Sequence, residues 1–290
     1  MMSMPTEIIT DETEITRAGF HWRENGGVTA LICTELEREG FSNAFSTRGG
    51  GVSPFPQDSL NLAGFNDDAA ENIYENRRRF FKLLGGEWTL AACWQTHSAD
   101  VRLVKDTTDA RPPEASLGEN VYCDALVTRT PGILLGVKTA DCVPALLADL
   151  RTGACAAIHA GWRGTVSSIV LRAMERMAAQ FGTQAANISA AIGPAANACC
   201  YEVGGEVIEA FHKNFADADS LFQQTREGHA LVDLHKANRE QLIGAGVSPD
   251  KIYTAPLCTM CRTDLFFSYR KEKRTAGRVG RLMSVIGKQG

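Results

Sequence analysis

Three apolar runs lie close together near the middle of the chain, at residues 133–137, 143–148 and 154–160. A polar corner at 139–142 separates the first two runs, and a turn at 149–153 separates the second from the third. Short apolar runs bounded by turn residues are typical of strands that are buried on both faces. The pattern therefore predicts three neighbouring buried strands with polar residues at their ends.

A helix is expected after these strands, because apolar residues recur at every third or fourth position. They are Val166, Ile169, Val170, Ala173, Met174, Met177 and Phe181. This spacing forms one apolar stripe along an amphipathic helix. Thr165 is placed to cap this helix at its N-terminus, and Gly182 is placed to end it.

The same patterns predict further elements on both sides of this region. Strands are expected at residues 19–23, 28–33, 41–47, 90–95, 125–128, 188–192 and 267–270, helices at 67–84, 203–215 and 233–243, and a polar loop at 105–120. Asn25-Gly26 predicts a hairpin turn between the first two strands, and Asp233 is placed to cap the last helix. Strands and helices alternate irregularly, and no Gly-x-Gly-x-x-Gly follows a first strand, so a dinucleotide-binding fold is disfavoured. The pattern indicates mixed α and β structure with a sheet-rich core.

Composition extends this prediction to the whole chain. The 290 residues are 44% hydrophobic and contain no Pro/Ser/Gly-rich linker, which predicts a single domain over residues 1–290 with its core at about 14–285. The net charge of −4 and the isoelectric point of about 5.9 give no general attraction to nucleic acid or to an anionic membrane. Small-molecule partners are expected instead.

The nine cysteines form a poor disulfide framework, because their number is odd and Cys199 and Cys200 are adjacent. Residues 1–16 contain no apolar signal-peptide segment, and no apolar run reaches the roughly 18 residues of a membrane span, so a reducing cytoplasm is expected. Cys258 and Cys261 have the Cys-x-x-Cys spacing of zinc and redox sites. No second such pair and no suitably spaced histidine pair accompanies them, which disfavours a structural zinc there.

Candidate chemistry lies with Cys142 and His159, which fall at a predicted strand start and strand end. If these strands form an antiparallel hairpin, both side chains lie at the same edge of the sheet. A thiolate and an imidazole placed together suit a zinc or copper ion, or a cysteine nucleophile with a histidine base. A cysteine beside an apolar run is also commonly an inert core residue, so the pair alone leaves three interpretations open.

Eight short sequences around these residues occur in a characteristic order. They are residues 46–53 (STRGGGVS), 59–62 (SLNL), 95–97 (QTH), 124–128 (DALVT), 140–142 (ADC), 159–164 (HAGWRG), 192–194 (IGP) and 266–270 (FFSYR). Together they resemble the polyphenol oxidase (laccase-domain) family, whose members also look like multifunctional purine nucleoside phosphorylases. The resemblance implies an α+β fold, a single layered α/β/β/α domain with mixed sheets, similar to the deamidating cytotoxic necrotizing factor toxins. It also implies one zinc or copper ion at one end of the sheets.

The resemblance further implies roles for individual residues. The metal ligands it implies are His97, Cys142 and His159, and the other site residues it implies are Arg48, Asn61, Gln95, Asp141 and Arg163. Arg48 lies in a Thr-Arg-Gly-Gly element expected to line the active site, where its guanidinium could hold phosphate or a ribose oxygen. Asp141 is expected to orient a ligand or relay a proton, and Asn61, Gln95 and Arg163 are expected to bind substrate. The basic residues near the C-terminus could also bring positive charge to a phosphate-bearing ligand.

Three classes of function compete. A multicopper laccase would need many histidines in His-x-His pairs, and the chain has six histidines, none so paired, which disfavours four-electron reduction of dioxygen. The second class is a cysteine hydrolase or amidase that uses Cys142 and His159. The third and favoured class is metal-dependent chemistry on purine nucleosides, namely phosphorolysis of adenosine, inosine, guanosine and methylthioadenosine and hydrolytic deamination of adenosine. Purine nucleosides and phosphate are then the expected partners. A metal-binding protein without turnover is the remaining alternative.

Overall fold

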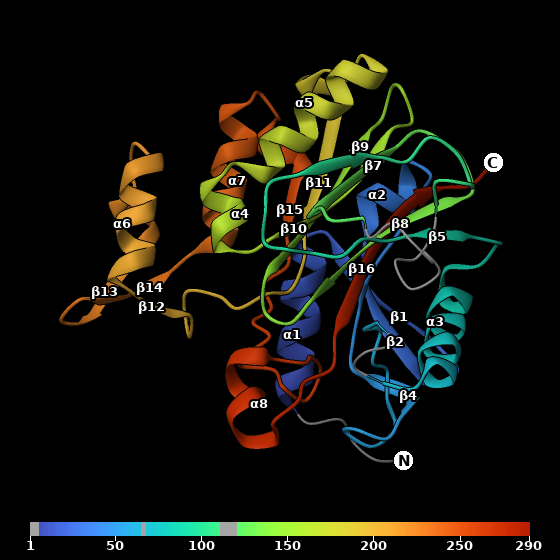
Figure 1. Ribbon diagram of the computed structural model, residues 1–290, viewed down its shortest axis with the longest axis horizontal. Helices are drawn as coiled ribbons and strands as arrows, with labels where there is room; N and C mark the ends of the chain where they lie inside the picture. Colours follow the sequence, from blue (N-terminus) through green and yellow to red (C-terminus); the bar gives the residue numbers. More distant parts are fainter. Residues whose placement is uncertain (1–5, 65–67, 111–120) are drawn as a thin grey trace.

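The computed structural model describes residues 6–64, 68–110 and 121–290, and two six-stranded sheets lie face to face at its centre (Figure 1). The first sheet has the order β1 (Phe20–Asn25), β2 (Val28–Cys33), β3 (Phe41–Ser46), β16 (Leu282–Lys288), β8 (Ile133–Thr139), β5 (Thr89–Ala91). The second has the order β15 (Ile252–Thr254), β11 (Ile188–Ile192), β9 (Val143–Asp149), β10 (Cys155–Ala160), β7 (Ala125–Thr128), β6 (Val101–Leu103). Both sheets contain parallel and antiparallel pairs, so both are mixed.

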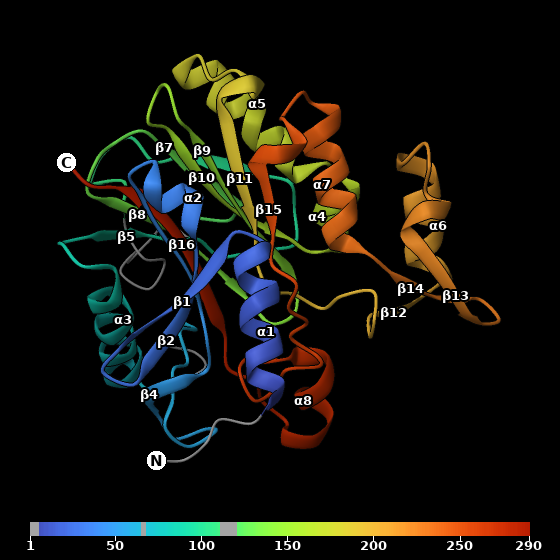
Figure 2. The same ribbon diagram turned by 180° about the vertical axis from the view of Figure 1, so that it is seen from behind.

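Helices cover the outer faces of the two sheets, as Figure 2 shows from behind. The described helices are α1 (Thr6–Arg17), α2 (Thr34–Arg38), α3 (Ala70–Leu84), α4 (Trp162–Val166), α5 (Ile169–Phe181), α6 (Gly205–Asn214), α7 (Leu234–Gly244) and α8 (Tyr269–Ala276). Phe80 of α3 packs on the first sheet, and Met177 of α5 packs on the second. A small sheet of β12 (Glu202–Gly204), β14 (His229–Val232) and β13 (Phe222–Arg226) stands beside this body with α6.

Strand β9 shows why the sheets are layered in this way. Its residues are all buried, and alternate side chains point to opposite faces. Ala145 and Leu147 pack toward α5, whereas Leu146 and Ala148 pack into the core between the two sheets. The central strands therefore have no polar face, and the predicted α/β/β/α order is confirmed.

The three central strands were predicted correctly, because β8, β9 and β10 match the three apolar runs within one or two residues. Strands β9 and β10 are antiparallel, and His159 lies opposite Pro144. Cys142 immediately precedes β9, so Cys142 and His159 lie at the same edge of the sheet, as the hairpin requires.

The helix expected over residues 166–181 is interrupted. Val166 is the last residue of a separate short helix, α4, and the rest of the predicted helix from Ile169 onward forms α5. Between them Ser168 takes a left-handed conformation with φ 59°. Thr165 is not a helix cap; its buried hydroxyl instead accepts a hydrogen bond from Asn238 Nδ2 at 3.0 Å. Gly182 does end the helix in the left-handed region, at φ 70°.

Two further expectations need correction. The glycines after Arg48 form a short strand, β4 (Gly49–Ser53), and a Cβ on Gly51 would lie 2.0 Å from the carbonyl oxygen of Ser59. A Cβ on Gly50 would lie 2.1 Å from the Gly27 carbonyl oxygen, so backbone packing requires Gly50 and Gly51, whereas a Cβ on Gly49 would have open space. The expected strand at 267–270 is the start of α8, which Ser268 caps by accepting a hydrogen bond from the Lys271 N–H.

Most other elements agree with the sequence, but the strand expected at 90–95 is only β5 (Thr89–Ala91), and the helix expected from Val203 starts at Gly205 because Val203 lies in β12. Gly26 and Gly27, both at positive φ, form the turn between β1 and β2, and Asp233 caps α7 by accepting from the Lys236 N–H at 2.8 Å. Most of the predicted polar loop, residues 111–120, lies outside the described residues. Within the described part of the chain, no helix is long and apolar enough to cross a membrane.

Candidate metal centre and active-site pocket

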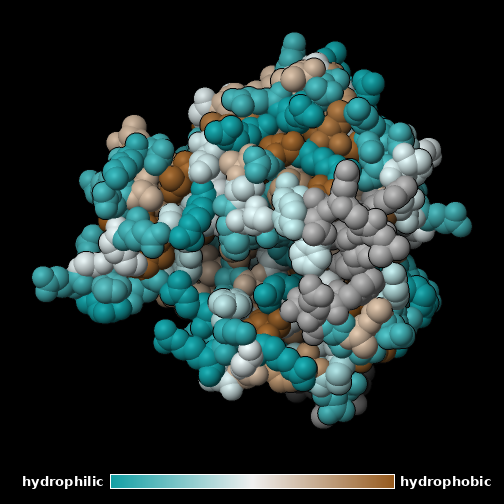
Figure 3. Space-filling model, viewed as in Figure 1, coloured by the Kyte–Doolittle hydropathy of each residue, from teal (hydrophilic) through white to brown (hydrophobic). Residues whose placement is uncertain are grey.

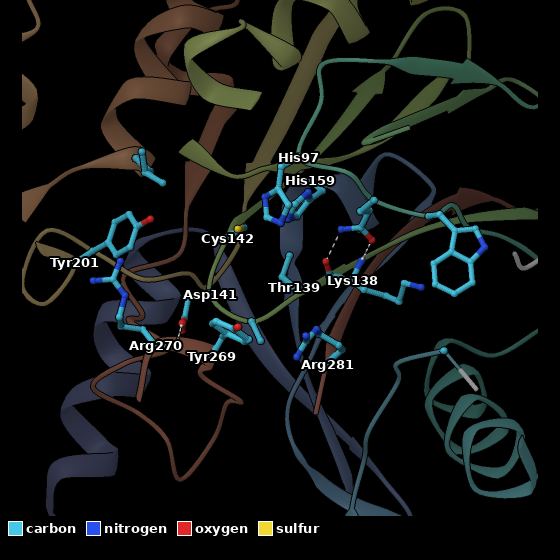
Figure 4. A pocket seen from close by; sticks show the side chains of 15 residues that line it. His97, Lys138, Thr139, Asp141, Cys142, His159, Tyr201, Tyr269, Arg270 and Arg281 are labelled. Atoms are coloured by element: carbon cyan, nitrogen blue, oxygen red, sulfur yellow. Dashed lines mark hydrogen bonds between the residues drawn. The ribbon is translucent and has the colours of Figure 1, made fainter. Parts of the chain in front are cut away.

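A pocket of about 610 Å³ opens where β8 and β10 end and β9 begins, and Figure 3 shows a recess near the centre of the face in view. Its volume lies within the range of small-molecule sites. It is lined by Gly64, Trp94, Gln95, His97, Lys138, Thr139, Ala140, Asp141, Cys142, His159, Tyr201, Leu234, Tyr269, Arg270 and Arg281. Figure 4 shows the labelled side chains around the cavity, with His97, His159 and Cys142 together on one side.

Three potential metal ligands converge in this pocket. His97, Cys142 and His159 each offer one ligand atom, and these atoms lie within 4.8 Å of one another. The two imidazole rings are 4.8 Å apart between centroids and inclined at 71°. His97 adopts a left-handed backbone conformation with φ 59°, which is uncommon for a residue with a side chain. A strained residue at such a position is typical of a functional site.

The carboxylate of Asp124 holds the loop that carries His97. It accepts hydrogen bonds from three consecutive backbone N–H groups, of Thr96 (3.1 Å), His97 (3.0 Å) and Ser98 (2.7 Å), and from the Ser98 hydroxyl (2.8 Å). Asp124 is fully buried, so this carboxylate needs such donors to remain charged. The hydrogen bonds stabilise the left-handed conformation of His97.

The same carboxylate also orients His159. Asp124 Oδ1 lies 2.7 Å from His159 Nδ1, which leaves Nε2 of the ring free for a ligand or metal. Burial raises the pKa of Asp124, but the hydrogen bond and charge of His159 outweigh it and bring the pKa to about 2. Asp124 is therefore an anion at neutral pH, and Nδ1 of His159 donates a hydrogen bond to it.

Cys142 and His159 favour each other's charged forms. Burial raises the pKa of Cys142, yet the charge and hydrogen bond of His159, followed by those of His97, bring that pKa to about 6. Burial lowers the pKa of His159, and the Cys142 thiolate and Asp124 together raise it to about 9. Without a metal, the pair is thiolate and imidazolium near neutral pH.

The donor set fits a metal ion. One thiolate and two imidazoles suit zinc or copper, and three protein ligands with one side toward a pocket are the arrangement of catalytic zinc sites. Gly161 supports this fit, because a Cβ there would lie 2.8 Å from His97 Nδ1 and 3.1 Å from Cys142 Sγ. Only glycine leaves room for this ligand cluster.

Two of the other residues implied by the resemblance also lie at the pocket. Asp141 accepts a hydrogen bond from the Thr259 hydroxyl at 2.7 Å and another from the Arg270 N–H at 2.8 Å. The side-chain amide of Gln95 bonds at both ends to the backbone of Lys138, at 2.6 and 2.8 Å. Gln95 therefore anchors the His97 loop to β8.

Three implied residues do not line this pocket. The guanidinium of Arg48 donates to the carbonyls of Thr263 (2.6 Å) and Phe266 (3.2 Å), pairs with Glu272 (2.9 Å) and stacks on Phe267. Asn61 is buried and accepts from the backbone N–H of Arg281 at 2.8 Å. Arg163 is exposed, stacks on Trp162 and pairs with Glu206 at 3.1 Å. All three side chains have partners within the protein.

Several residues that line the pocket or support its ligands were missed or only partly anticipated. Asp124 was seen in the sequence without a role, although a carboxylate directly before a wholly apolar strand signals a buried charge that needs partners. Arg270 and Arg281 belong to the basic C-terminal stretch that was expected to attract phosphate. Tyr269 lies with Arg270 in the FFSYR motif, but neither it nor Tyr201 was given a role from the sequence.

The comparisons with known proteins agree with this geometry. The family model described as "Multi-copper polyphenol oxidoreductase laccase" matches residues 42–289. The chain is 37% identical to a purine nucleoside phosphorylase of Bacteroides thetaiotaomicron, over 82% of this chain and 89% of that protein. It is 39% identical to adenosine deaminase RL5 of an unknown prokaryotic organism, over 84% and 96%. The crystal structure of YlmD from Geobacillus stearothermophilus superposes with a TM-score of 0.85 at 32% identity, covering 94% of this chain and 99% of that one.

Proposed function

The chain belongs to the multi-copper polyphenol oxidoreductase laccase family, as its motifs indicated, and we propose a function from this premise. We propose that the protein is a metal-dependent enzyme that acts on purine nucleosides. The proposed reactions are phosphorolysis of adenosine, inosine, guanosine and methylthioadenosine, and hydrolytic deamination of adenosine. The observation that carries the proposal is the cluster of His97, Cys142 and His159, buried on one side by Asp124 and open to a nucleoside-sized pocket on the other.

Three protein ligands would hold the ion, His97, Cys142 and His159. When bound, zinc, or copper in its place, would supply Lewis-acid polarisation at the floor of the pocket. Asp124 keeps the Nε2 lone pair of His159 directed at the ligand cluster, because it binds the proton on Nδ1. His159 is buried, Cys142 is partly buried and His97 is exposed, so the cluster is reached from the pocket side.

Both proposed reactions exchange a group on the nucleoside. In phosphorolysis, a phosphate oxygen bonds to C1′ of the ribose as the C1′–N9 bond breaks, which gives ribose 1-phosphate and the free base. In deamination, a water oxygen bonds to C6 of adenosine and the C6–N bond breaks, which gives inosine and ammonia. In deamination the attacking water loses a proton and the departing amino group gains one, so a fixed group is needed to accept and return that proton. In phosphorolysis the attacking phosphate oxygen is already ionised, and the departing purine takes up a proton.

Asp141 is the proposed proton acceptor. The Thr259 hydroxyl binds one of its oxygens and the Arg270 N–H binds the other, so its carboxylate is fixed at the pocket wall. Each oxygen has two lone pairs, and one on each stays available for a substrate hydroxyl or amine. Asp141 can therefore orient substrate or accept a proton without moving.

Arg270 and Arg281 replace Arg48 as the proposed phosphate-binding residues, since both line the pocket and Arg48 does not. The guanidinium of Arg270 lies 4.9 Å from the ring centroid of Tyr201, and that of Arg281 lies 5.8 Å from the ring centroid of Tyr269. A guanidinium has five donors, so a phosphate can be bound while these contacts persist. The two tyrosines offer aromatic surface to a purine.

A cysteine hydrolase remains the second candidate, because the lowered pKa of Cys142 and its contact with His159 are also those of a nucleophile and base. The laccase class has less support. Among the described residues, only the His97 cluster combines histidine with cysteine, and the other group of potential ligands contains four cysteines and no histidine.

The test is incubation of metal-quantified protein with adenosine or inosine, with and without phosphate, followed by chromatography of the products. We expect inosine from adenosine without phosphate, free base and ribose 1-phosphate only with it, and loss of both activities after chelation. Activity that survives complete removal of metal would overturn the proposal in favour of a nucleophilic Cys142. An active protein would then be alkylated and inactivated by iodoacetamide.

A further inference from the structure

Four cysteines form a second cluster outside the candidate active site. Cys199 and Cys200 come from the segment between β11 and β12, and Cys258 and Cys261 come from the segment between β15 and α8. Their four sulfur atoms lie within 4.8 Å of one another. The Cys-x-x-Cys pair thus has the partner pair that the sequence spacing did not reveal, because it lies in a different loop.

The distances between these sulfurs suit a shared ion better than disulfide bonds. All four cysteines are free, and the Sγ atom of Cys261 lies 3.5 Å from that of Cys199 and 3.0 Å from that of Cys200. A disulfide requires about 2.05 Å. Four thiolates bound to zinc at about 2.3 Å stand roughly 3.8 Å apart at the corners of a tetrahedron. Small movements of these side chains would complete that geometry.

We propose that Cys199, Cys200, Cys258 and Cys261 bind a structural zinc ion, separate from the ion at the candidate active site. Four thiolates fill all positions of a tetrahedral ion and leave none for a substrate. The ion would therefore stabilise the fold and take no part in turnover. This inference does not rest on the proposed function.

The contacts around the cluster indicate what the zinc would hold together. Ala195 and Cys258 pair in a parallel bridge, and the Thr259 N–H donates to the Ala195 carbonyl at 3.0 Å. The Ala196 N–H donates to the backbone carbonyl of Asp141 at 2.8 Å, and the Thr259 hydroxyl donates to its carboxylate. A zinc ion would crosslink two loops that both contact Asp141.

The same crosslink would position one wall of the pocket. Tyr201, which directly follows Cys200, lines the pocket and packs beside the cluster. The apolar cluster here is small, with only Ala196, Cys258 and Met260 as its buried members. Because so little apolar surface joins the two loops, a metal crosslink supplies the stability that a larger core would otherwise provide.

The test is the zinc stoichiometry of the purified protein and its variants, measured by elemental analysis and by mass spectrometry under native conditions. We expect two zinc ions per parent chain grown with zinc. The double variant Cys258→Ser/Cys261→Ser should lose one ion relative to the parent. The matched control is Cys93→Ser, at a buried cysteine outside both clusters whose thiol donates to the Cys123 carbonyl, a bond that serine can keep. This control should lose none.

X-ray absorption identifies the ligands directly. The Cys142→Ala substitution weakens zinc binding at the candidate active site. The zinc that remains in this variant should have four sulfur neighbours at about 2.3 Å. A majority of nitrogen or oxygen neighbours would overturn the proposal. Unchanged zinc content in the double variant would also overturn it, as would disulfide masses for these four cysteines in zinc-loaded protein.

If the double variant does not fold, a milder variant and the parent protein still test the inference. Cys261 is exposed, so the single variant Cys261→Ser is the milder substitution, and circular dichroism checks its fold. Loss of one zinc from a folded Cys261→Ser protein supports the site. A parent chain that holds a single zinc with one sulfur neighbour excludes it without any variant.

Discussion

The two ligand clusters differ in how the fold builds them. His97, Cys142 and His159 lie at strand ends and in a loop held by a buried carboxylate, and their fourth side faces a pocket. The four-cysteine cluster joins two loops and supplies a complete set of thiolates. An incomplete set directed at a cavity is typical of catalytic metals, and a complete set is typical of structural ones. Ligand number and surroundings are therefore the basis on which we propose different tasks for the two clusters.

The comparison also shows how differently the clusters are supported. In the first, Asp124 contacts both histidine-bearing segments, so the ligands keep their places even without metal. In the second, a small apolar cluster and a few backbone hydrogen bonds join the loops. We expect the first cluster to be preformed and the second to depend on its ion for order.

Removal of a ligand from the open site, the cluster of His97, Cys142 and His159, should have the largest effect on activity. Cys142→Ala deletes the thiolate and leaves two imidazoles, which bind zinc far more weakly, so occupancy of that site should fall below half. The rate of both proposed reactions should fall by roughly 1000-fold or more, equivalent to about 4 kcal/mol. Full activity with a full metal load in this variant would show that the open cluster is not the reaction centre.

Arg270→Ala should lower phosphorolysis by about 10- to 150-fold, because a hydrogen bond to a charged group contributes roughly 1.5 to 3 kcal/mol. Deamination uses no phosphate and should change much less. Initial rates of both reactions at saturating nucleoside measure the difference, and Arg270→Lys should recover only part of the loss.

Arg48→Ala is the matched control for this substitution. Its guanidinium binds two carbonyls and Glu272 away from the pocket, so the variant should lose thermal stability and keep its phosphate dependence. A selective loss of phosphorolysis in Arg48→Ala, with Arg270→Ala unaffected, would return the phosphate-binding role to Arg48.

Asp124→Asn should weaken metal binding at the open site by about 10- to 100-fold, the usual cost of losing a carboxylate behind a histidine ligand. Competition with a chromophoric chelator measures this affinity. Asp149→Asn is the control, because Asp149 is equally buried and also accepts backbone N–H groups, of Arg151 and Thr152. It should lower stability by about 1 to 3 kcal/mol without changing metal affinity.

The sequence predicted the parts of the fold that repeat a local pattern. The apolar runs gave β8, β9 and β10, and the pairing of β9 with β10 correctly brought Cys142 to His159. It failed where a tertiary contact decides the local conformation. Thr165 bonds to Asn238 across 73 residues instead of capping a helix.

The candidate site was predicted only as far as its motifs reach. The resemblance implied His97, Cys142 and His159, which the structure brings together, but the direction of a side chain depends on partners far away in the sequence. Arg48 turns to carbonyls and to Glu272 near the C-terminus, which no spacing shows. The four-cysteine cluster escaped notice for the same reason, since each loop alone holds only half of a zinc site.

The smallest expected effect is a shift in the pH at which one thiol reacts. In metal-stripped protein, the charges of His159 and His97 offset burial and lower the pKa of Cys142 to about 6, from an ordinary value of 9.0. Only the thiolate is alkylated, so iodoacetamide labelling of Cys142 should be half-maximal near pH 6 and decline below it. Peptide mass spectrometry measures this labelling separately for Cys142 and Cys261. Zinc should protect both thiols, whereas His159→Ala should move only the Cys142 midpoint upward, because it removes the imidazolium beside that thiolate. A Cys142 midpoint that stays near 9 in the stripped parent would mean that the open cluster is not preformed, and the contrast between the two sites would disappear.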